Sequence, residues 1–201
     1  PPRFQAEDGI RDTNSGLVGS EMCIRDRTGP KAEVRREVKK ILINLALFQV
    51  GWLVCVLGGD LYAVAFTIAA LLVHNWLVLS SYSEWKLIGV VVLIGCLWDM
   101  LMAQAGVIHY ADALLFGIPL WLLCLWLLFA TTFMHGLFWM HRYLWLAALF
   151  AAVMGPASYW FGTNLTEAQL GAPIMTSLAI MAVGWGLLFP CGIYYAGKLK
   201  A

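Results

Sequence analysis

After residue 40 the chain alternates between long apolar runs and short polar or glycine-containing connections. Each run has the roughly 17 to 25 residues that a membrane-spanning helix requires. Strands in the bilayer core would leave unpaired backbone groups at their edges, so helices are the expected structure. The pattern predicts an all-α, polytopic membrane protein. Its six expected transmembrane helices lie at about residues 41–57, 61–80, 86–105, 117–135, 144–162 and 173–197.

The positions of lysine and arginine predict the orientation of these helices. If the N-terminus is cytoplasmic, all nine basic residues after residue 27 fall in inside segments and none falls in an outside turn. Positive charge collects on the cytoplasmic side of membrane proteins, so both termini are expected inside. We expect four residues of this set to contact lipid headgroups or fix the topology: Lys39, Lys40, Lys86 and Arg142.

Composition agrees with a bilayer protein and excludes an ordinary soluble domain. Hydrophobic residues make up 61% of the 201 residues and charged residues 12%, about half the usual charged share. A net charge of +1 gives no basis for nucleic-acid binding. The lipid bilayer is the expected partner.

The ends of the chain differ from the apolar region. Residues 1–27 contain four arginines and five acidic residues, without apolar periodicity, which is typical of a disordered tail. Residues 6–26 also resemble translated sequencing-adapter contamination, and a genuine cytosolic tail is the alternative. Residues 28–40 form a basic juxtamembrane segment, and residues 198–201 a short cytoplasmic tail.

Asp99 is the most unusual residue of the apolar region. Thirteen residues separate it from Lys86, which places it roughly 20 Å along the helix axis in a core about 30 Å thick. A carboxylate at this depth costs about 2.5 to 3.5 kcal/mol, so we expect it to face the bundle with a partner or to be protonated. It could relay protons or bind a substrate, or form a structural hydrogen bond between helices.

Polar residues of the first two predicted helices are the expected partners of Asp99, either directly or through water. Gln49 and Asn44 belong to the first helix, and His74 and Asn75 to the second. The alternative for Gln49 and Asn44 is ordinary interhelical hydrogen bonding. The alternative for His74 is a neutral side chain bonded to a carbonyl oxygen.

Thr131 and His135 are weaker candidates, four residues apart on one face of the fourth predicted helix. The nearby His141 does not complete an HExxH motif, and no second histidine box is present, so we expect no metal. No cofactor motif appears either. Contacts of His135, His141 and Arg142 with headgroups are the preferred interpretation.

Three apolar motifs carry a family resemblance: FQVGWLVCVLG at 48–58, PLWLLCLWLLFATTFMHGLFWM at 119–140, and GPASYW at 155–160 followed by LGAP at 170–173. Through their order and spacing, residues 44–197 resemble the bacterial integral-membrane domain-of-unknown-function family 2878. The resemblance implies a small polytopic protein of the bacterial inner membrane whose function is not established. It implies no catalytic residues, and it suggests lipid- or fatty-acid-modifying proteins as partners.

Three functions remain open at this point. The leading hypothesis is a non-enzymatic accessory protein that acts on or near membrane lipids. A small proton-coupled transporter is the alternative, because Asp99 and His74 lie at membrane depth and Pro156 and Pro190 could bend their helices. A membrane-embedded enzyme is the third, with Asp99, His74 and His135 as its acid–base set.

Overall fold

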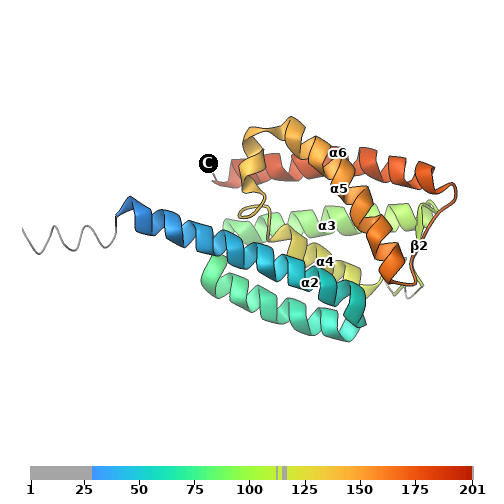
Figure 1. The fold of residues 1–201 in the computed structure, drawn as a ribbon, viewed down its shortest axis with the longest axis horizontal. Helices are drawn as coiled ribbons and strands as arrows, with labels where there is room; N and C mark the ends of the chain where they lie inside the picture. Colours follow the sequence, from blue (N-terminus) through green and yellow to red (C-terminus); the bar gives the residue numbers. More distant parts are fainter. Residues whose placement is uncertain (1–28, 112, 115–116, 201) are drawn as a thin grey trace, which may run out of the picture. The chain divides into compact units, whose positions relative to one another are not determined.

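The computed structural model describes residues 29–200, except 112, 115 and 116. The chain divides into two compact units, Pro1–Lys39 and Lys40–Ala201. The predicted tail at residues 1–27 lies outside the described residues. Apart from the two-residue strands β1 and β2, the regular elements are helices, so the prediction of an all-α chain is confirmed (Figure 1).

The first long helix, α2 (Pro30–Val73), contains a reversal at Gly59. The backbone there has φ 71° and ψ −177°, a conformation that glycine adopts at little cost. The two arms of α2 pack together, because Cys55 and Ala63 belong to one buried cluster and the Lys40 ammonium contacts the Ser80 hydroxyl at 3.5 Å. Figure 1 shows the arms as the blue-to-cyan and teal helices. The turn expected between residues 57 and 61 therefore lies at Gly59.

The second arm ends in a π-helical turn, η1 (His74–Val78), and α3 (Ser83–Gln104) follows after a short connection. The next helix, α4 (Leu120–Ala130), has only 11 residues. At 1.5 Å per residue it is about 16 Å long, which is too short to cross a bilayer core alone. The helix predicted at 117–135 is thus shorter in the structure.

Two consecutive threonines explain where α4 ends. The hydroxyl of Thr131 donates to the Leu128 carbonyl at 2.7 Å, and that of Thr132 donates to the Phe129 carbonyl at 2.6 Å. Such bonds compete with the helical backbone pattern. The chain continues through tight turns into a 3₁₀ segment, η2 (Phe138–Arg142).

Two long helices complete the chain: α5 (Leu144–Leu165) and α6 (Ile174–Lys200), which pack against each other. The loops before α4 and α6 pair through β1 (Ile108–His109) and β2 (Gln169–Leu170), which are antiparallel. The apolar pattern did not predict this pairing, because two-residue strands leave no periodic signal.

The α4 helix forms the centre of the second unit. Every second residue from Leu122 to Ala130 is buried. Trp126 packs in the cluster formed with α3 and α6, whereas Leu128 packs against the two arms of α2. Figure 1 shows α4 between the α2 arms and the pair α3 and α6.

The outward surface of the helices is apolar, as expected for contact with lipid. Large hydrophobic side chains such as Leu93, Leu149 and Leu187 are exposed, whereas Glu84 and Asp99 are fully buried. Four segments are long and apolar enough to cross a membrane: Lys31–Val78, Ser83–Gln104, Leu144–Leu165 and Ile174–Lys200. The first segment contains the Gly59 reversal.

Candidate functional site

Asp99 is bonded to two aromatic side chains. The indole N–H of Trp126 in α4 donates to Oδ2 at 2.6 Å, and the hydroxyl of Tyr159 in α5 donates to Oδ1 at 2.5 Å. No lysine, arginine or histidine of the described residues lies within ion-pair distance of this carboxyl group. The donors to Asp99 in the structure are thus these two aromatic residues rather than Gln49 or His74. Asp99 belongs to α3 and contacts α4 and α5 through these two bonds.

Glycines create the space for the tryptophans of this region. A Cβ at Gly95, one turn before Asp99, would overlap the Trp126 ring. Gly155 likewise accommodates the ring of Trp185, which stacks on Trp126 with ring centroids 5.4 Å apart. Small residues at helix interfaces allow close approach in membrane proteins. Here they allow Trp126 to reach the carboxylate.

A cavity of about 460 Å³ lies beside this hydrogen-bonded group, between α2, α4, α5 and α6. Its walls include Trp126 and Tyr159, the two donors to Asp99, whereas Asp99 itself does not line it. Most of the other lining side chains are apolar or aromatic, and Gln49 is among the few polar ones.

Tyr110 closes the cavity near the paired loops. Its hydroxyl is buried and has no hydrogen-bond partner among the described residues. Burial raises the pKa of this phenol, and the nearby charge of Asp99 raises it further. Tyr110 is therefore neutral at physiological pH.

The other predicted polar residues have separate positions. Asn44 is buried and donates to the Thr131 carbonyl at 3.2 Å and hydroxyl at 3.0 Å, a contact between α2 and the end of α4. Asn75 is exposed, as are Lys39, Lys86 and Arg142.

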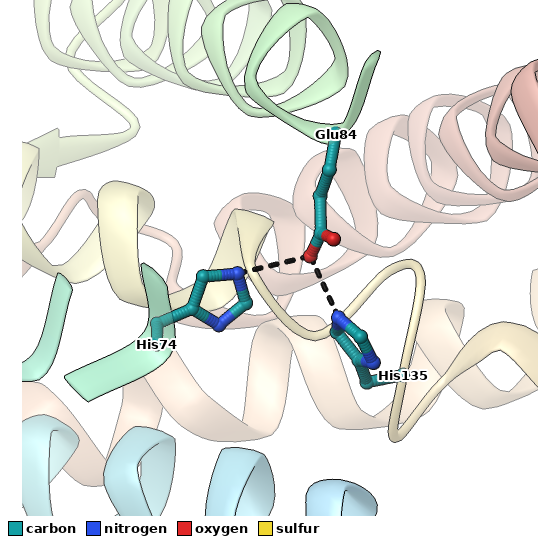
Figure 2. A group of neighbouring side chains, drawn as sticks. All are labelled: His74, Glu84 and His135. Atoms are coloured by element: carbon teal, nitrogen blue, oxygen red, sulfur yellow. Dashed lines mark hydrogen bonds and ion pairs between the residues drawn. The ribbon is translucent and has the colours of Figure 1, made fainter. Parts of the chain in front are cut away.

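A second buried group brings together His74, Glu84 and His135 (Figure 2). The histidine Nε2 atoms lie 3.0 Å and 2.8 Å, respectively, from the same atom, Oε1 of Glu84. The two imidazole rings are nearly perpendicular, with centroids 5.5 Å apart. All three residues are buried, with exposed fractions of 1% for His74, 0% for Glu84 and 6% for His135.

Two irregular pieces of backbone and the start of one α-helix position this group. His74 begins the π-helical turn η1, Glu84 lies in the first turn of α3, and His135 lies in the turns after α4. Single π-helical turns are frequent at functional sites. The three residues come from different elements, yet their ligand atoms all lie within 4.8 Å of one another.

Sequence reasoning found two members of this group and missed the third. Glu84 precedes Lys86 in a short polar connection, where an acidic residue is usually solvated. In the structure it is fully buried, with its Oε1 atom against His74 and His135. Trp126 and Tyr159 were missed because aromatic residues in apolar helices resemble core or interface residues.

The profile of a family described as "Protein of unknown function (DUF2878)" matches residues 41–191. No curated protein matches the chain significantly. No solved structure does so either.

Proposed function

Since the chain belongs to the family described as "Protein of unknown function (DUF2878)", we propose its function from its geometry. The chain is a multi-pass membrane protein that holds a lipid acyl chain in the cavity between α2, α4, α5 and α6. In this role it is an accessory protein that acts on or near lipids of the bacterial inner membrane. The single observation that carries the proposal is the apolar cavity.

The dimensions of the cavity suit an acyl chain. Its volume of about 460 Å³ is within the usual range for small-molecule sites. The lining of α2 extends from Leu45 to Val56, and that of α5 from Phe150 to Thr163. At 1.5 Å per residue these stretches are about 16 Å and 20 Å long, similar to the hydrocarbon depth of one leaflet or more.

The cavity also borders the outer surface. Met154 and Phe161 line it, yet they are 51% and 55% exposed. In a bilayer this surface faces hydrocarbon, so a lipid chain can enter sideways between α2 and α5. A water-soluble ligand would have to cross an apolar lining.

The proposal includes six membrane segments with both termini cytoplasmic. The reversal at Gly59 splits the first long segment into two, and α4 with its following turns supplies another. Two contacts support an arrangement in which the basic residues lie at one end of the helices. The Lys40 ammonium contacts the Ser80 hydroxyl, and the Lys200 ammonium donates to the Met134 carbonyl at 3.4 Å. Reporter fusions at residues 60, 82, 112, 142, 167 and 200 test this topology.

Photocrosslinking tests the lipid proposal. The full chain in native-lipid nanodiscs is exposed to a phospholipid whose acyl chain carries a diazirine, and the labelled residues are mapped. We expect labelling of the cavity face of α2 and α5. Ala157→Phe, which fills the cavity from α5, should reduce that labelling several-fold.

Val153→Phe is the matched control, since Val153 lies on the exposed face of the same helix and does not line the cavity. It should leave cavity labelling unchanged. Labelling spread evenly over the lipid-facing surface, and insensitive to Ala157→Phe, would contradict the proposal.

A second candidate function is proton-linked handling of the bound molecule. The observation in its favour is that Tyr159 lines the cavity and also bonds to Asp99, so its hydroxyl connects the buried acid with the ligand space. Asp99→Asn removes the buried acid, and Tyr159→Phe removes the hydroxyl that donates to it.

Membrane lipid composition and protein level test this candidate together. If the acid acts on lipids, both variants should accumulate normally and shift the lipid profile in the same direction. Normal accumulation of both variants with an unchanged membrane lipid composition would contradict this candidate function. Asp99 would then be a structural hydrogen-bond acceptor.

A further inference from the structure

We propose that His74, Glu84 and His135 bind a divalent transition-metal ion of the zinc type. The proposal is independent of the lipid cavity, whose lining includes none of the three residues. Two imidazole nitrogens and one carboxylate oxygen are a donor set used by catalytic zinc sites and by non-haem iron sites. Three protein ligands also leave a coordination position open.

The distances fit ligands that share one ion. Zinc binds histidine nitrogen and carboxylate oxygen at about 2.0 to 2.2 Å, so neighbouring ligands at angles of roughly 90° to 110° lie about 2.8 to 3.6 Å apart. The two Nε2–Oε1 distances are 3.0 Å and 2.8 Å. Small rotations of the side chains would place an ion between them.

Hydrogen bonding alone does not satisfy the group. The His74 contact has ion-pair distance but not hydrogen-bond geometry, and Oε2 of Glu84 is buried without a partner among the described residues. Buried polar atoms without partners cost free energy, and a buried carboxylate costs more. An ion ligated by both histidines and by Glu84 would remove most of this cost.

The position of the group is consistent with access for ions. Glu84 lies two residues before the exposed Lys86, and His74 lies six before Ser80, which contacts Lys40. The group is therefore near the basic end of the helices rather than at their centre. The turn that carries His135 also contributes Thr132 and Leu137 to the cavity wall, so the ion would lie close to one end of the cavity.

Metal content of the purified full chain tests the proposal. The protein is extracted in detergent, stripped with chelator, incubated with Zn²⁺ alone, desalted and measured by elemental analysis. We expect about one tightly bound zinc per chain, as for a three-ligand protein site. Glu84→Gln and His135→Ala should each lower occupancy roughly tenfold or more.

The matched control is His109→Ala, which removes an exposed histidine of β1 outside the group. It should bind zinc as the unmodified chain does. Equal zinc in Glu84→Gln and in the control would identify an adventitious ion only, and a chain that binds no zinc would also overturn the proposal.

X-ray absorption of the zinc-loaded, unmodified chain keeps the proposal testable even if a variant fails to accumulate. The expected spectrum shows nitrogen and oxygen ligands at about 2.0 to 2.2 Å and no sulfur. A sulfur shell at about 2.3 Å would assign the ion to cysteines and overturn the site.

Discussion

Trp126 donates its indole N–H to Oδ2 of Asp99 at 2.6 Å and thereby joins α4 to α3. Tyr159 adds a bond from α5 to the other carboxyl oxygen. One buried side chain thus connects three helices, and the same two aromatic residues form part of the cavity wall. The stability of the helix packing and the shape of the cavity depend on the same contacts.

Trp126→Phe should destabilise the protein by about 1 to 3 kcal/mol, because it leaves a buried carboxyl oxygen without its donor. Thermal unfolding in detergent measures the loss. Trp145→Phe is the control, since Trp145 is exposed on α5 and makes no such bond. Equal unfolding temperatures for the two variants would show that the indole bond contributes nothing to stability.

Gly95→Ala should cost about 1 to 3 kcal/mol through overpacking, because its Cβ would overlap the Trp126 ring. Gly89→Ala is a close control on the same helix, where a Cβ meets nothing within 4 Å. That change should be neutral or stabilise by up to about 1 kcal/mol, because alanine favours helix. Thermal unfolding in detergent measures both variants. An equally destabilised Gly89→Ala variant would contradict the explanation by packing against Trp126.

Asp60→Ala should destabilise α4 by about 0.5 to 2 kcal/mol, the usual value of an N-terminal cap. Oδ1 of Asp60 accepts the backbone N–H of Trp121 at 2.9 Å, in the first turn of α4. Asp60→Asn keeps an acceptor and should lose less. Hydrogen exchange of the Trp121 amide measures the effect, and faster exchange is expected in Asp60→Ala.

Gly59→Val should destabilise the turn between the arms of α2 by about 1 to 3 kcal/mol, because a β-branched residue is strained at φ 71°. Space is not the cause, since a Cβ there meets nothing within 4 Å. Gly59→Asn should cost about as much, because the ψ of −177° lies outside the left-handed helical region that asparagine tolerates. Thermal unfolding measures both variants, and an unchanged unfolding temperature for either would contradict a conformational cost.

The helices could be predicted from sequence because apolar length is set by the bilayer. The predicted segments at 86–105 and 144–162 closely match α3 and α5. The end of α4 could not be predicted, because it depends on where two threonine hydroxyls bond. The strand pairing depends on two loops that are about 60 residues apart in sequence meeting in space.

The site was predicted less completely than the helices. Asp99 stood out because burial of a carboxylate in an apolar helix is costly. Its partners did not stand out, since an indole and a phenol look like ordinary apolar-helix residues. Counting residues along the predicted helices places Gln49 and His74 at a membrane depth similar to that of Asp99. Which side chains meet also depends on how each helix is rotated about its axis, and packing sets that rotation.

The Asp60 cap has a consequence for how the chain enters the membrane. With 11 residues, α4 is too short to insert into the membrane as an independent segment. The acceptor for an N–H of its first turn, Asp60, lies 61 residues earlier, beside the reversal of α2. The first turn of α4 gains this acceptor only where α2 has reversed at Gly59, so the same short segment of chain both joins the arms of α2 and stabilises the start of α4.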